Sequence, residues 1–124
     1  MLSKEGKYWR LIKKSTKEEF CFLIGVENWA IELREKEFLS LYELLIRLNK
    51  QLNSIQDKLM DEELITLELE IIPWYAQLEG NKNEWSLRFV FESEDETRSF
   101  EMYWPIPIAK ILFFEIRKMW ESMH

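Results

Sequence analysis

Residues 29–52, WAIELREKEFLSLYELLIRLNKQL, decide the fold, because their pattern returns in residues 100–123, FEMYWPIPIAKILFFEIRKMWESM. Each copy opens with apolar residues at every second position, as in a half-buried strand, and continues with apolar residues at helical spacing. An internal repeat constrains the architecture before the chemistry of any residue is considered. The matched helix positions are Phe38, Leu41, Tyr42, Leu45, Leu48 and Leu52 in the first copy and Ala109, Leu112, Phe113, Ile116, Met119 and Met123 in the second.

Length and composition favour one domain over residues 1–124. The chain is 47% hydrophobic and 15% aromatic, which is enough apolar material for a substantial core. Only three glycines and three prolines interrupt it, so no linker is expected. The repeat divides this domain into two units, at about residues 7–58 and 63–123.

Hydropathy and cysteine content predict a soluble, cytoplasmic protein. No apolar run reaches the roughly 18 residues of a membrane-spanning helix, and Lys4, Glu5 and Lys7 stand where a signal peptide would be apolar. We therefore expect no membrane contact. The single cysteine, Cys21, has no partner for an internal disulfide and is expected to be a small, buried apolar residue.

The first unit is predicted to be a three-stranded meander followed by a long helix. Strands are expected at 7–14, 20–24 and 29–34, with a turn at 25–28 where Gly and Asn tolerate a tight reversal. The helix is expected at 36–58, where no Gly or Pro interrupts the periodicity.

The second unit is predicted to have the same organisation. Ile65, Leu67, Leu69 and Ile71 alternate with polar residues, Pro73 bends or interrupts this strand, and the chain resumes from Trp74 to a turn at 80–82. Strands through 85–91 and 100–104 flank a polar loop at 93–97, and a helix runs from Pro107 to about Ser122. The strand and helix order is βββα followed by ββ(β)βα.

These elements predict an α+β fold. Two antiparallel curved sheets, each a β-meander followed by a helix, are related by a pseudo-twofold axis across which the helices pack. One chain then forms an internal pseudo-dimer, which is compatible with a monomer or with a homodimer.

The sequence predicts no enzyme, cofactor or metal site. The only histidine is His124, and the three glycines form no phosphate-binding cluster. Carboxylates at Glu32, Glu68, Glu70 and Glu101 fall on the polar sides of strands. Because arginines share these sides, cross-strand charge pairing explains the carboxylates better than metal binding or acid-base catalysis does.

The charge is unevenly distributed along the chain. The net charge is −6, which is unfavourable for a protein that coats nucleic acid, yet residues 1–17 are strongly basic. Aromatic and basic side chains of opposite parity to the core are the candidates for stacking on unpaired bases and holding phosphates. The candidate nucleic-acid-binding residues are Tyr8, Arg10, Lys13, Lys14, Arg88 and Tyr103.

Several short strings resemble a family of small proteins of unknown function restricted to cyanobacteria. They are Trp9-Arg10-Leu11, Gly25 followed by Trp29-Ala30-Ile31-Glu32-Leu33, Leu59-Met60-Asp61-Glu62-Glu63, Leu67-Glu68-Leu69-Glu70, Trp74 with Leu78-Glu79-Gly80, and Arg98 with Glu101 and Trp104. That family is similar in fold to the single-stranded-DNA-binding transcriptional regulators of the Whirly and positive cofactor four types. The resemblance implies that curved sheets bind unpaired DNA around Tyr8, Arg10, Lys14 and Arg88.

Two functions therefore remain open. The first is a non-enzymatic protein that binds single-stranded DNA or RNA or takes part in transcription. The alternative is a protein-interaction or assembly module, in which the same sheet face or the aromatic-rich second helix docks a protein partner. A continuous positive strip across the sheet would favour the first function, and interspersed Glu and Arg the second.

Overall fold

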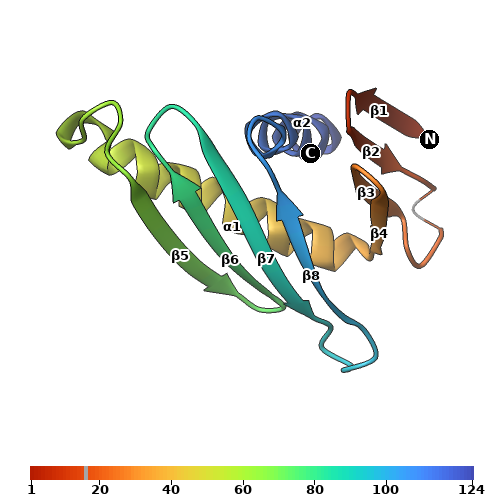
Figure 1. Ribbon diagram of the computed structural model, residues 1–124. Coiled ribbons are helices and arrows are strands. Elements are labelled where there is room, and N and C mark those ends of the chain that lie inside the picture. Colours follow the sequence, from red (N-terminus) through yellow and green to blue (C-terminus); the bar gives the residue numbers. More distant parts are fainter. Residues whose placement is uncertain (16) are drawn as a thin grey trace.

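The computed structural model describes residues 1–15 and 17–124. Each half of the chain forms an antiparallel four-stranded sheet in sequential strand order, followed by a helix (Figure 1). This confirms the predicted α+β architecture. The first half contains β1 (Leu2–Gly6), β2 (Trp9–Lys13), β3 (Phe22–Val26), β4 (Trp29–Leu33), α1 (Glu35–Ile55) and the 3-10 helix η1 (Gln56–Lys58). The second contains β5 (Ile65–Ile71), β6 (Trp74–Gly80), β7 (Trp85–Glu92), β8 (Ser99–Trp104) and α2 (Ile108–Met123).

The first sheet has one strand more than the sequence predicted. β1 pairs with β2 in a register that joins Leu2 to Lys13 and Gly6 to Trp9. Every residue of β1 is exposed, so the strand has none of the alternation that marks a half-buried strand. It pairs with β2 as a local hairpin, because only Lys7 and Tyr8 connect the two strands and Tyr8 has a φ of +69°. The strand predicted at 7–14 therefore begins at Trp9, and its first two positions form the turn.

The turn between β3 and β4 is shorter than predicted. β3 continues through Gly25 to Val26, and only Glu27 and Asn28 connect it to β4. Gly25 therefore lies inside a strand. The Arg10 guanidinium crosses the strand at this point, since a Cβ built on Gly25 would lie 2.5 Å from Arg10 Nη2. Glycine here allows a close side-chain approach rather than a turn.

The two helices pack on the inner sides of the sheets and on each other. α1 lies against β5 and β6, whereas α2 contacts β7 and β2 and so joins the two sheets. Tyr42 of α1 and Trp120 of α2 have ring centroids 5.9 Å apart, and the Tyr42 hydroxyl donates to Glu121 at 2.8 Å. Side chains from both repeats consequently share one apolar cluster.

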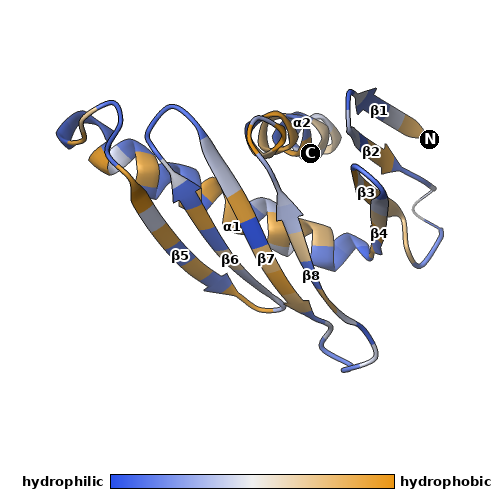
Figure 2. Ribbon diagram, in the orientation of Figure 1, coloured by the Kyte–Doolittle hydropathy of each residue, from blue (hydrophilic) through white to orange (hydrophobic). Residues whose placement is uncertain are grey.

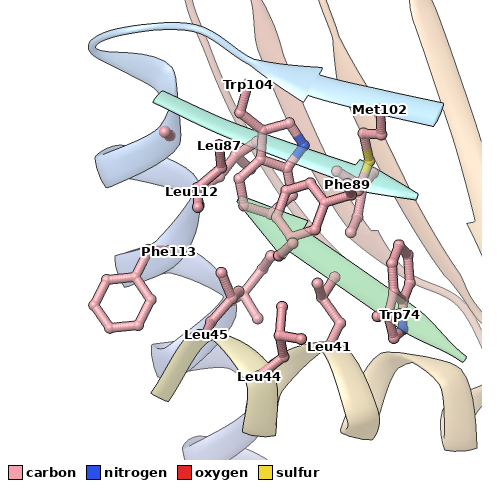
Figure 3. Packing of buried hydrophobic residues seen from close by; sticks show 14 of the residues in the cluster. Leu41, Leu44, Leu45, Trp74, Leu87, Phe89, Met102, Trp104, Leu112 and Phe113 are labelled. Carbon is pink, nitrogen blue, oxygen red and sulfur yellow. The ribbon is translucent and has the colours of Figure 1, made fainter. Parts of the chain in front are cut away.

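Aromatic and aliphatic side chains fill the space between α1, α2 and the second sheet. Trp74, Phe89 and Trp104 extend from the sheet toward Leu41, Leu44 and Leu112 of the helices (Figure 3). The alternation that predicted β5 to β8 appears as alternating bands of hydropathy along these strands (Figure 2). The face of the second sheet away from the helices is therefore its polar side.

Candidate interaction surface

The outer face of the second sheet is the side turned away from α1 and α2 (Figure 1). Strand register places its side chains in rows that cross the sheet. One row runs Glu68, Gln77, Arg88 and Tyr103, with Gln77 Nε2 donating to Glu68 at 3.4 Å. The next row begins at Glu70 and passes through Tyr75 and Val90 to Glu101.

This face is acidic. Arg88 is the basic residue among the strand positions that point outward, and its Nη2 lies 3.8 Å from Glu101 in an exposed pair. The positive strip that phosphate binding requires is therefore absent from this described sheet face, and most of its charged side chains repel an anion. The acidic residues are Glu68, Glu70, Glu79, Glu92 and Glu101.

Exposed apolar and aromatic groups lie among these carboxylates. Tyr103 is 53% exposed and Val90 is 39% exposed. Desolvation raises the pKa of the Tyr75 phenol, and the neighbouring Glu68 carboxylate raises it further. Aromatic groups held beside polar ones are typical of surfaces that bind proteins.

A recess on this face is closed on one side by the first sheet. Trp29, the first residue of β4, lines it together with Arg88, Glu101 and Tyr103, and its volume is about 440 Å3. Trp29, Trp85 and Trp104 each occupy the apolar positions of an alternating strand, which predicts that all three face the core. Trp85 and Trp104 are buried, but Trp29 is only half-buried because it stands at the border between the sheets.

A second recess continues the junction between β4 and β8. It has a volume of about 670 Å3 and is lined by Phe20, Ile31, Glu32 and the segment 97–100. No ladder joins β4 to β8 in the described sheets. The two edge strands thus border an inter-sheet groove, which we define by Phe20, Trp29, Ile31 and Glu32 on one side and Ser99, Phe100, Glu101, Met102 and Tyr103 on the other.

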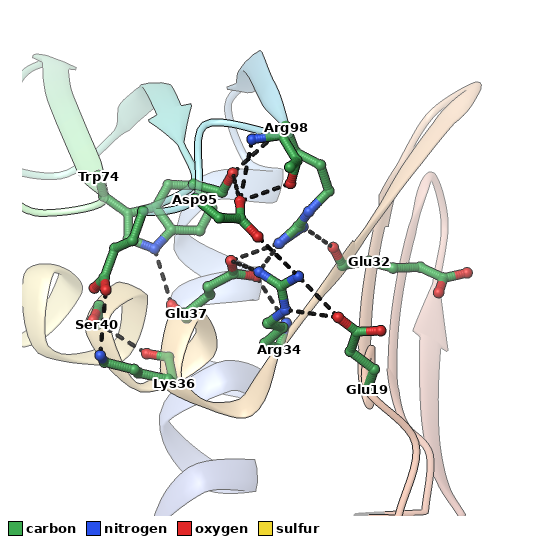
Figure 4. A network of polar contacts seen from close by, with 12 residues as sticks. Glu19, Glu32, Arg34, Lys36, Glu37, Ser40, Trp74, Asp95 and Arg98 are labelled. Carbon is green, nitrogen blue, oxygen red and sulfur yellow. Dashed lines mark hydrogen bonds and ion pairs between the residues drawn. The ribbon is translucent and has the colours of Figure 1, made fainter.

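An ionic cluster fixes one end of this groove (Figure 4). The Glu37 carboxylate, at the first turn of α1, accepts hydrogen bonds from Arg98 of the second repeat and from the backbone N–H of Arg34. Arg34 in turn pairs with Glu19 and with Asp95. Glu37 is buried, so this cluster ties the two repeats together with charge-assisted hydrogen bonds.

The cluster was not predicted from the sequence. The strand predicted at 29–34 ends with Arg34 on its polar side, but in the structure Arg34 is the residue that precedes α1. The available signal was an Arg three residues before a Glu at a helix start, where an acidic side chain favours the N-terminal turn. The distant partner Arg98 had no local signal at all.

The basic candidates of the first sheet are dispersed. Tyr8 occupies the turn before β2, with Lys7 Nζ 5.3 Å from its ring centroid, and it is 60% exposed. Arg10 lies over Gly25, and Lys14 pairs with Glu32 at 3.3 Å. Lys13 has the strand parity of the buried Leu11 and therefore points to the opposite face from Arg10.

The remaining two candidates lie on the other sheet. Arg88 and Tyr103 are direct cross-strand partners, as a shared surface requires. Arg88 and Tyr103 thus share a surface on the second sheet, whereas Arg10 lies on the first sheet and Lys14 directly after its strand β2. Arg88 and Lys14 each have a glutamate beside them, Glu101 and Glu32 respectively.

Metal-ligating residues do not cluster in the described part of the chain. Among residues 1–15 and 17–124, no three His, Cys, Asp or Glu side chains gather as a potential ion site. In the same residues, no helix is both long enough and apolar enough to cross a membrane.

The fold and this surface define a small α+β domain with two sheets around shared helices. The chain belongs to the family of the domain of unknown function DUF1818, whose model matches residues 4–119. No curated protein matches it.

A solved structure from a cyanobacterium resembles the chain closely. It is the crystal structure of a protein of unknown function from Prochlorococcus sp. NATL2A, described as a member of the DUF155 family. The two chains share 40% identity, the match covers 97% of this chain and 99% of that one, and the TM-score is 0.88. The predicted relation to cyanobacterial proteins of unknown function is supported.

Proposed function

We propose that this protein is a non-enzymatic interaction module that binds a basic protein partner through the outer face of its second sheet. The observation that carries the proposal is the charge of that face, where the outward positions of the described strands carry five glutamates and the single basic residue Arg88. Complementary charge steers association and selects partners. Tyr103, Val90 and Trp29 supply the apolar contact area that such an interface needs at its centre.

Charge reversal on the face tests this proposal. Replacing Glu68, Glu79 and Glu101 together by lysine should abolish capture of proteins from a nuclease-treated extract that the unmodified protein retains. The matched control replaces Glu18, Glu43 and Glu62 by lysine. These are exposed acidic residues outside this face, so the control produces the same change in net charge. Equal losses for both triple variants would contradict the proposal, since net charge alone would then explain the capture.

Single-stranded nucleic acid is the second candidate ligand. It is favoured by the basic segment 1–17 and by the exposed Tyr8 ring beside Lys7. The resemblance in sequence strings that implies a fold like that of single-stranded-DNA-binding regulators points the same way. Titration of a labelled oligonucleotide at low salt tests it, because electrostatic attraction is strongest there. No binding under that condition, or equal binding by an Arg10→Glu and Lys14→Glu variant, would contradict this candidate.

A further inference from the structure

The inter-sheet groove has an open strand edge along one side. Ser93 N donates to Arg98 O at 2.8 Å, which sets the alternation of bonded pairs in the β7–β8 hairpin. It follows that the backbone groups of Phe100 and Met102 form hydrogen bonds with β7. The N–H and C=O groups of Ser99, Glu101 and Tyr103 point away from β7.

The edge of β4 points into the same groove. A two-residue turn makes Val26 and Trp29 a bonded pair, so the backbone groups of Ala30 and Glu32 face outward. The position of Arg98 agrees with this, because its Nη1 donates to Glu32 O at 3.2 Å. In the described residues, the outward backbone groups of β8 have no corresponding partner among the backbone hydrogen bonds.

The two sides of the β8 edge differ in chemistry. Toward the outer face stand Glu101 and Tyr103, both exposed. On the interior side, β8 presents the half-buried Phe100. Ile31 and Phe20 lie across the groove from it. A strand added here would place alternate side chains against Glu101 and Tyr103 on one face and against apolar groups on the other.

We propose that the groove binds an extended segment of a partner protein, which pairs antiparallel with β8 and alternates basic and apolar residues. Strand addition to an open edge is a recurring mode of peptide recognition, in which the backbone supplies affinity and alternate side chains supply specificity. The edge from Ser99 to Tyr103 spans about 13 Å, four steps of about 3.3 Å, and can therefore pair with a five-residue segment. This inference rests on the proposed function and identifies its ligand.

A synthetic peptide of four Lys-Val repeats, with both ends blocked, is the probe. Titrated into 15N-labelled protein, it should shift the amide signals of Ser99, Glu101 and Tyr103 and the indole N–H signal of Trp29. In a bonded antiparallel pair, the two facing residues have their side chains on the same face of the sheet. The peptide lysines that lie beside Glu101 on the outer face therefore occupy bonded pairs, and their backbone amides donate to β8. Methylating the lysine backbone nitrogens should therefore abolish binding, whereas methylating the valine nitrogens should not.

Two variants separate backbone pairing from charge. Ser99→Pro removes an outward N–H at the first residue of a strand, a position that accepts proline, and should weaken peptide binding about fivefold. Ser99→Ala, which keeps the N–H, should bind like the unmodified protein. Glu101→Lys should weaken binding, and Glu70→Lys on the distant strand β5 should weaken it less.

The outcomes distinguish the groove from the proposed function as a whole. Binding with shifts confined to β5 and β6, and with equal effects of the two methylated peptides, would overturn strand addition but leave the acidic face as a binding surface. Absence of binding at millimolar peptide and low salt would overturn both.

Discussion

The guanidinium of Arg98, immediately before β8, donates hydrogen bonds to both carboxylate oxygens of Glu37 in the first turn of α1. The same guanidinium lies 4.6 Å from the Phe20 ring centroid and 5.4 Å from that of Phe91. One ion pair therefore connects the helix of the first repeat with the last hairpin of the second, beside the inter-sheet groove.

Glu37→Gln should destabilise the protein by about 3 kcal/mol, because a partly buried arginine loses its counter-charge. Urea denaturation measures the change. The matched control is Arg88→Gln, which breaks an exposed pair and should cost less than about 1 kcal/mol. A Glu37→Gln loss no larger than the control would show that the cluster does not hold the repeats together.

Asp95→Asn should destabilise the protein at neutral pH, with an effect that declines in acid. Hydrogen bonds from Thr97 and then Ser93 hold the pKa of the Asp95 carboxyl well below its usual range. Because the folded pKa lies below the unfolded value of about 4, the stabilisation is complete above that pH and is lost as pH falls further. Thermal unfolding of both proteins from pH 7 to pH 2 tests this, and a difference independent of pH would contradict it.

Gly80→Ala should cost about 1–3 kcal/mol, because Gly80 has a φ of +152° that residues with a Cβ rarely adopt. The added Cβ would also lie 2.3 Å from the backbone oxygen of Glu84. Gly25→Ala is the matched control, since its Cβ meets the flexible end of Arg10, which can move aside. Equal losses in urea denaturation would argue against backbone strain at Gly80.

The thiol of Cys21 should react with iodoacetamide only after unfolding. The residue is 2% exposed, and burial raises the pKa of its thiol, so both access and thiolate formation are disfavoured. Mass spectrometry after labelling, with and without denaturant, provides the measurement. Rapid labelling of the native protein would place the thiol in an accessible site.

The sequence predicted the elements whose patterns are local. The alternation at Trp29, Ile31 and Leu33 and the long helical stretch after it returned as β4 and α1, and their offset copies as β8 and α2. The constant spacing between residues 29–52 and 100–123 holds only for these elements. The hairpin before β4 has a two-residue turn, whereas a six-residue loop precedes β8, so the earlier strands cannot match at the same spacing.

Other features were not predictable. β1 has no periodic pattern, although only a two-residue turn joins it to β2. Gly25 was assigned to a turn because Arg10, which lies across it, is remote in sequence. For the surface, the alternation along the strands correctly predicted that Arg88 and Tyr103 are exposed. It could not show that β4 and β8 would face each other across a groove, since that arrangement depends on how both sheets pack around the helices.

Parallel titrations of the Lys-Val peptide and of a labelled oligothymidylate, followed by fluorescence anisotropy at low salt, show whether the protein binds a basic strand or nucleic acid. The acidic sheet face predicts that the peptide binds more tightly than the oligonucleotide and that Glu79→Lys with Glu101→Lys weakens peptide binding. Tighter binding of the oligonucleotide, lost on Arg10→Glu with Lys14→Glu and accompanied by no peptide binding, would instead make single-stranded nucleic acid the ligand.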